Sequence, residues 1–124
     1  MAKTILIVED ELSMQRALKS KLEHAGYVVR AAVDGEEALA SLRASKPDLM
    51  LLDLIMPKMD GISVLRQVKS DEDLRAVPVV ILTNLSSGDK VAEAMQLGTF
   101  DFLVKANYSL DDVLKKVVDR VGQP

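Results

Sequence analysis

The sequence predicts one α/β domain, a doubly wound five-stranded parallel sheet with helices on both faces. Five short apolar runs, rich in β-branched and aliphatic residues, alternate with five longer segments of helical period. Strict alternation of this kind is typical of β-α units, whose strands run parallel in one sheet. The 124 residues contain no internal repeat and no Gly/Ser tract that would divide them. We therefore expect residues 1–124 to form a single domain.

The first half of the chain contains two β-α units. Thr4–Val8 is rich in β-branched and aliphatic residues and predicts a buried strand. A helix is expected over about residues 13–25, where apolar residues recur along one side, and Gly26 is placed to end it. Residues 27–33 predict a second strand, and residues 36–44 predict a short helix after an Asp-Gly turn.

The second half continues the alternation. The remaining elements, strand and helix in turn, are expected at residues 49–52, 62–70, 79–82, 87–97, 100–104 and 110–121. The run at 49–52 is apolar at consecutive positions, as expected of a strand covered on both faces. Gly98 is placed to end the fourth helix. The last helix carries an apolar stripe that includes Val113 and Val117.

Composition excludes several classes of protein and partner. The chain has 16 basic and 19 acidic residues, a net charge of −3 and no basic run, so nucleic acid is not an expected partner. No apolar run approaches the roughly 18 to 20 residues of a membrane helix, and the N-terminus lacks the pattern of a secretory signal. The absence of cysteine rules out disulfides and thiolate sites. We expect a cytoplasmic domain that acts on another protein.

Polar residues follow four of the five predicted strands. In an open parallel α/β sheet the ligand site lies at the carboxyl ends of the strands, where these residues would meet. The residues are Glu9, Asp10, Asp53, Thr83 and Lys105. Each has a simpler individual explanation, such as a helix cap or a solvated charge. Their joint placement at one edge favours a functional site.

The chemistry of this set suggests phosphoryl transfer. Two carboxylates about 5 Å apart repel by about 3 kcal/mol at an effective dielectric of about 20, so a cation is needed among three. Oxygen ligands without nearby His or Cys suit Mg²⁺. Mg²⁺, the Lys105 amine and the Thr83 hydroxyl can together stabilise a transferring phosphoryl group, and Asp53 can be its nucleophilic acceptor.

The same residues give the chain a resemblance to a known family. It resembles the receiver domains of response regulators in two-component signalling, including the chemotaxis receivers. The matching segments, in order and spacing, are residues 5–11, 52–61, 81–83 and 97–105. The resemblance implies a flavodoxin-like (βα)5 fold with strand order 2-1-3-4-5. It also implies that Asp53 accepts a phosphoryl group from a histidine kinase's phosphohistidine or from a small phosphodonor.

The resemblance further implies a metal site. Asp10 and Asp53 would ligate Mg²⁺ together with the backbone carbonyl of Ile55. Glu9 would act largely through metal-bound water. Self-catalysed phosphorylation and slow loss of the phosphoryl group would then make the domain a switch rather than a turnover enzyme.

A switching mechanism is also implied. Lys105 would pair with the phosphoryl group, Thr83 would donate a hydrogen bond to it, and Phe102 would turn inward behind Thr83. This movement would change the surface formed by the fourth helix, fifth strand and fifth helix. The alternative is that Phe102 is a fixed core aromatic.

The sequence departs from the family pattern at two positions. Receivers commonly carry proline after the lysine, whereas Ala106 follows Lys105 here. Phe102 has no hydroxyl, so any switching must depend on packing. The family tunes hydrolysis of the acyl phosphate two residues beyond the acceptor and the threonine, at positions that are Ile55 and Leu85 here. Neither side chain can orient water, so we expect a long-lived phosphoryl state.

The expected partners are a sensor histidine kinase or phosphotransfer protein, a downstream protein target, and a second copy of the chain in a phosphorylation-dependent homodimer. No output domain is expected within the chain, so output requires another protein or a longer chain. Two further functions stay open. One is a constitutive interaction module that does not switch. The other is a phosphoaspartyl hydrolase, although Ile55 stands where such enzymes ordinarily place a second aspartate. Flavin binding is less favoured than either of these.

Overall fold

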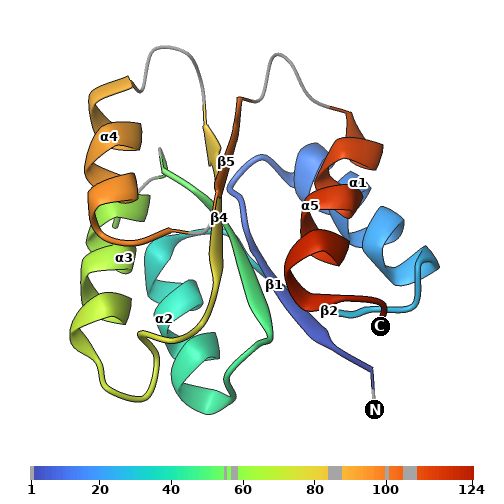
Figure 1. Ribbon diagram of the computed structural model, residues 1–124, viewed down its shortest axis with the longest axis horizontal. Coiled ribbons are helices and arrows are strands. Elements are labelled where there is room, and N and C mark those ends of the chain that lie inside the picture. Colours follow the sequence, from blue (N-terminus) through green and yellow to red (C-terminus); the bar gives the residue numbers. More distant parts are fainter. Residues whose placement is uncertain (1, 55, 57–58, 84–87, 100, 105–108) are drawn as a thin grey trace.

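The computed structural model contains five parallel strands and five helices (Figure 1). It describes residues 2–54, 56, 59–83, 88–99, 101–104 and 109–124. The elements are β1 (Thr4–Val8), α1 (Leu12–His24), β2 (Val28–Ala32), α2 (Gly35–Ala44), β3 (Leu49–Asp53), α3 (Gly61–Ser70), β4 (Val79–Thr83), α4 (Gly88–Gln96), β5 (Asp101–Val104) and α5 (Leu110–Val121). The strand order is β2-β1-β3-β4-β5, which confirms the predicted fold.

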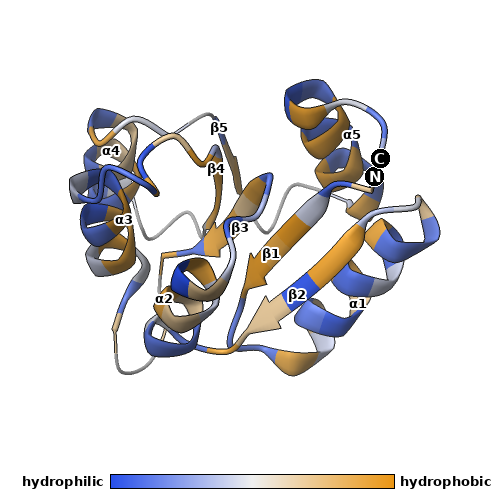
Figure 2. Cartoon of the chain, turned by 90° about the horizontal axis from the view of Figure 1, so that it is seen from below, coloured by the Kyte–Doolittle hydropathy of each residue, from blue (hydrophilic) through white to orange (hydrophobic). Residues whose placement is uncertain are grey.

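The sheet is the middle of three layers. Helices α2, α3 and α4 cover one face, and α1 and α5 cover the other (Figure 1). Because successive side chains of a strand point to opposite faces, each buried strand contributes to two cores. Leu6 and Met50 lie in the core under α2 and α3, whereas Ile5 and Leu49 lie in the core under α1 and α5. Figure 2 shows the resulting hydrophobic central strands and the hydrophilic outer sides of the helices.

Strand register brings the carboxyl ends together. Val8 pairs with Ala32 on one side and with Leu52 on the other. Asp53 pairs with Leu82 across the next ladder. The residues that follow β1 and those that end β3 and β4 therefore lie along one edge of the sheet, at the top of Figure 1.

The predicted elements agree with the observed ones to within two residues at each end, and the differences have local causes. Helices α2 and α3 each begin one residue earlier than predicted, at a glycine. The reason is that Asp34 and Asp60 cap these helices by accepting hydrogen bonds from the amides three residues ahead. Gly26 has φ of 106° and follows the end of α1, as expected of a glycine that ends a helix.

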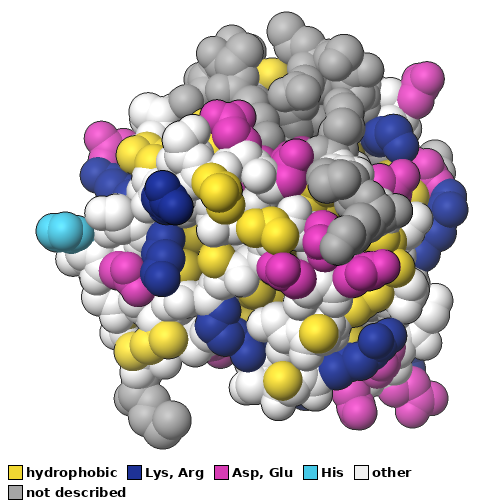
Figure 3. All heavy atoms as spheres, turned by 180° about the vertical axis from the view of Figure 1, so that it is seen from behind, with side chains coloured by type: hydrophobic (Ala, Val, Ile, Leu, Met, Phe, Trp, Pro, Cys, Tyr) yellow, Lys and Arg dark blue, Asp and Glu magenta, His cyan; other side chains and the backbone are white. Residues whose placement is uncertain are grey.

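The described surface carries mixed charges. Figure 3 shows acidic and basic side chains interspersed over one face, with hydrophobic side chains as small separate spots. Among the described residues, no helix is both long enough and apolar enough to cross a bilayer.

Candidate functional site

Three carboxylates converge at the predicted edge of the sheet. Glu9 and Asp10 directly follow β1, and Asp53 is the last residue of the neighbouring strand β3. Each offers an oxygen within 4.8 Å of the other two. Glu9 is 0% exposed and Asp53 4%, whereas Asp10 is exposed. The structure thus brings together three of the residues that the sequence singled out.

Hydrogen bonds to its main chain and its side chain hold Glu9 in place. Its amide donates to the carbonyl of Ala32 at 3.0 Å, which extends the pairing of β1 with β2 by one residue. Its carboxylate accepts a hydrogen bond from the Glu11 amide at 3.2 Å. The first acid of the cluster is therefore fixed at both its main chain and its side chain.

The start of α3 packs directly against Asp53. The Gly61 amide donates to the carbonyl of Leu54 at 2.9 Å. A Cβ at Gly61 would lie 2.4 Å from the carbonyl oxygen of Asp53, so only glycine permits this approach. Asp60 caps α3 by accepting from the Ser63 amide at 2.9 Å, and this hydrogen bond lowers the pKa of Asp60 below its ordinary value. The helix predicted over residues 62–70 leaves out this cap, although an acid directly before a helical period is a capping signal.

The donor set of the cluster fits a hard divalent cation. Two oxygens bound to one Mg²⁺ at about 2.1 Å lie roughly 3 to 4 Å apart, and oxygens of the three acids all lie within 4.8 Å of one another. Full charges on the two buried acids, Glu9 and Asp53, would repel by about 3.5 kcal/mol at 4.8 Å and an effective dielectric of about 20. Carboxylate oxygens without a nearby imidazole or thiolate are the ligands that Mg²⁺ prefers. The residues present therefore suit Mg²⁺.

Other predicted site residues are described in part or not at all. The backbone of Thr83 ends β4 and pairs with Val104, so it lies at the same edge as Asp53. Outside the described residues lie Ile55, Leu85, Lys105 and Ala106, and also residues 87 and 100, the first residues of the predicted fourth helix and fifth strand. Their proposed roles stay predictions.

Phe102 lies on the edge strand β5 and is 39% exposed. Phe102 belongs to neither of the two hydrophobic cores, so the core placement in the alternative is wrong, and the inward turn of Phe102 stays a prediction. Its amide donates to the carboxylate of Asp101 at 2.8 Å, and Asp101 also pairs with Lys116 of α5. Burial alone would raise the Asp101 pKa, but the hydrogen bonds from Lys116 and Phe102 lower it below its ordinary value.

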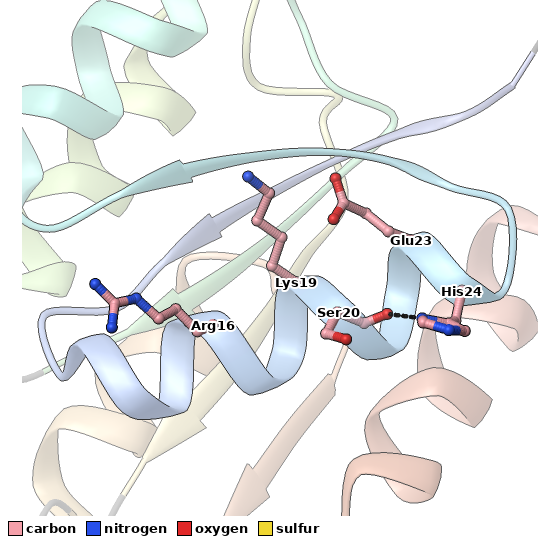
Figure 4. A pocket seen from close by; sticks show the side chains of 5 residues that line it. All are labelled: Arg16, Lys19, Ser20, Glu23 and His24. Atoms are coloured by element: carbon pink, nitrogen blue, oxygen red, sulfur yellow. Dashed lines mark hydrogen bonds between the residues drawn. The ribbon is translucent and has the colours of Figure 1, made fainter.

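A surface hollow of about 590 Å³ lies elsewhere, along the outer side of α1 (Figure 4). Its lining residues are Arg16, Lys19, Ser20, Glu23 and His24. The His24 ring nitrogen Nδ1 lies 3.2 Å from the Ser20 carbonyl, within the same helix. None of the acids at the sheet edge lines this hollow, so it is separate from the candidate site.

Comparison with known proteins places this arrangement in a family. The sequence model of the response regulator receiver domain matches residues 5–118. A probable transcriptional regulator, ycf27 of Porphyridium aerugineum, is 38% identical over 121 residues, which are 96% of this chain and 49% of that protein. The chain thus spans about half the length of this relative.

Two solved structures show the same fold. The phosphorylated cyanobacterial phytochrome response regulator RcpA has a TM-score of 0.86 and 32% identity, over 98% of this chain and 94% of RcpA. The receiver domain of the sensor histidine kinase PA1611 from Pseudomonas aeruginosa PAO1 carries a magnesium ion in its active-site cleft. It has a TM-score of 0.88 and 28% identity, over 98% of this chain and 99% of that domain. Taken with the 2-1-3-4-5 sheet and the acids at its carboxyl edge, these matches show that the chain belongs to the response regulator receiver domain family.

Proposed function

We propose that this receiver domain is a phosphorylation-activated switch in which Asp53 accepts the phosphoryl group. The donor is the phosphohistidine of a sensor histidine kinase or a phosphotransfer protein, in the cytoplasm. The observation that carries the proposal is the convergence of Glu9, Asp10 and Asp53 within 4.8 Å at the carboxyl edge of the sheet. RcpA, which is phosphorylated, and PA1611, which binds magnesium, have the same fold and support it.

The reaction transfers one phosphoryl group between two side chains. A carboxylate oxygen of Asp53 attacks the phosphorus, the bond from phosphorus to the imidazole nitrogen breaks, and the imidazole leaves with the electron pair of that bond. Asp10, Asp53 and the carbonyl of Ile55 would hold Mg²⁺, with Glu9 acting through water. The ion would supply positive charge against the phosphoryl oxygens. The product is an acyl phosphate on Asp53.

The remaining roles follow the family resemblance. Lys105 would pair with the phosphoryl group, and Thr83 would donate a hydrogen bond to it. Phe102 would then turn inward from its exposed position on β5 and shift the surface of α4, β5 and α5. This surface would recruit a downstream protein or a second copy of the chain. The domain modifies itself and does not turn over a substrate.

Mass spectrometry of the intact protein tests the chemistry. The wild type is incubated with a small phosphodonor, with Mg²⁺ or with a chelator. We expect one phosphoryl group per chain, only with Mg²⁺, and none on Asp53→Asn. Asp48→Asn is the matched control, because Asp48 precedes the other end of β3 and accepts a hydrogen bond from the Thr4 amide. An adduct that persists in Asp53→Asn would contradict the proposal.

The switch is tested separately from the chemistry. Amide NMR shifts in α4, β5 and α5 should change on phosphorylation of the wild type and not of Asp53→Asn. Stable phosphorylation without such changes would favour the constitutive interaction module. Sedimentation with and without phosphorylation then distinguishes a homodimer from a different protein partner.

A further inference from the structure

Gln15 connects helix α1 to the ends of two strands. It is the fourth residue of α1, and its side-chain nitrogen Nε2 lies 3.0 Å from the carbonyl oxygen of Glu9 and 3.2 Å from that of Ala32. Both N–H groups of one amide are thus used on backbone carbonyls at the ends of β1 and β2. The Ala32 carbonyl also accepts a hydrogen bond from the Glu9 amide at 3.0 Å, so this one carbonyl accepts from both Glu9 and Gln15.

Gln15 also binds Glu11, at the other end of the acidic loop formed by Glu9, Asp10 and Glu11. The backbone amide of Gln15 donates to the carbonyl of Glu11 at 2.9 Å. Gln15 therefore binds the main chain on both sides of Asp10, through its side chain at Glu9 and through its backbone at Glu11. Asp10 lies between these two anchored residues.

Asp10 needs such support because its neighbours repel it. Its carboxylate lies within 4.8 Å of those of Glu9 and Asp53, and its side chain is exposed. An exposed side chain that is repelled by two like charges moves toward solvent if its backbone is free to turn. Fixing the backbone on both sides limits that movement and keeps the acids at a spacing that one cation can bridge.

We propose that Gln15 is a positioning residue that holds the Glu9–Glu11 loop so that Asp10 and Glu9 face Asp53 ready for Mg²⁺. This inference rests on the proposed function, because it assigns Gln15 a part in preparing the same site. Gln15 itself touches neither the ion nor the phosphoryl group. Loss of a residue that orients metal ligands typically weakens metal binding by about 10 to 100-fold.

The test variant is Gln15→Met, which keeps the length of the side chain and removes both N–H groups. Mg²⁺ affinity is measured by titration calorimetry, and the rate of phosphoryl uptake at Asp53 is followed by mass spectrometry at low and at saturating Mg²⁺. We expect the Mg²⁺ dissociation constant to rise by about 10-fold. The rate should fall at low Mg²⁺ and return close to the wild-type value at saturating Mg²⁺.

Two controls separate positioning from stability. Gln96→Met makes the same change at an exposed residue at the end of α4 and should leave Mg²⁺ affinity unchanged. Leu22→Val loosens the core under α1 without touching the loop, since Leu22 is fully buried in the last turns of that helix. It should lower the midpoint of thermal unfolding while the Mg²⁺ dissociation constant stays at the wild-type value. If Gln15→Met binds Mg²⁺ as tightly as the wild type, the inference is wrong.

A measurement on the wild type keeps the test decisive if Gln15→Met does not fold. The chain has four glutamines, whose side-chain amides give separate NMR signals. Of these, we expect the Gln15 amide to shift most on addition of Mg²⁺, and an unchanged Gln15 signal would overturn the inference. Failure of the proposed function looks different, because the wild type itself would then take up no phosphoryl group on Asp53.

Discussion

Removing the charge of Asp10 should stabilise the protein without Mg²⁺ and abolish its stabilisation by Mg²⁺. Asp10→Asn keeps the shape of the side chain and removes two repulsive contacts, with Glu9 and with Asp53, over at most 4.8 Å. Asp10 is exposed, so a dielectric near that of water applies and each contact costs about 0.9 kcal/mol. We expect the free energy of unfolding of the variant in chelator to exceed that of the wild type by about 1 to 2 kcal/mol.

Urea unfolding with and without Mg²⁺ measures both effects. At a Mg²⁺ concentration about 100 times the dissociation constant, the wild type should gain about 2.7 kcal/mol, and Asp10→Asn should gain much less. In chelator, high salt should reduce the difference in free energy of unfolding between Asp10→Asn and the wild type, because salt screens the repulsion between the acids. The matched control is Asp89→Asn, which removes an exposed acid from the first turn of α4. Because the helix dipole favours an acid there, this change should not raise the free energy of unfolding in chelator. A destabilised Asp10→Asn in chelator would refute the reasoning.

Two further changes test the support behind Asp53. Asp60→Ala should lower the free energy of unfolding by about 1 kcal/mol at pH 7, because it removes the cap of α3 at the Ser63 amide. The pKa of Asp60 is lower in the folded protein than its unfolded value near 3.8. The stability that ionised Asp60 contributes is therefore present above pH 3.8 and is lost as the pH falls through the lower folded pKa. Denaturant titrations across that range should show the difference in free energy of unfolding between wild type and Asp60→Ala closing. Gly61→Ala should destabilise by about 1 to 3 kcal/mol and slow phosphorylation, because its Cβ would lie 2.4 Å from the Asp53 carbonyl oxygen. Gly88→Ala is the control, because a Cβ there meets nothing within 4 Å, and it should leave the free energy of unfolding unchanged or raise it. An equal loss of unfolding free energy in the two variants would contradict the role assigned to Gly61.

Sequence alone predicts the fold because its signals are local and repeated. Each strand is a short apolar run, each helix has its own period, and the strict alternation of the two determines a parallel sheet. The acids of the site were found for the same reason. Glu9 and Asp53 each directly follow an apolar run, and Asp10 is the next residue after Glu9. The carboxyl ends of parallel strands meet at one edge.

The parts that sequence reasoning missed depend on contacts between segments. Gln15 is an ordinary helical residue in the sequence, and its role appears only when its amide meets the carbonyls of Glu9 and Ala32. Backbone carbonyls exist at every residue, so no pattern of residue types marks this contact. The strand order 2-1-3-4-5 implied by the resemblance already places Phe102 on an edge strand, and the structure adds that its side chain is exposed there.

The central claim is that one acid of the three, Asp53, carries the phosphoryl group. Reduction of the phosphorylated wild type with borohydride converts an aspartyl phosphate to homoserine, and peptide mapping then locates the altered residue. We predict homoserine in place of Asp53 alone, formed only when Mg²⁺ was present during phosphorylation. Conversion of Asp10 or Glu9 instead, or equal conversion without Mg²⁺, would contradict the account.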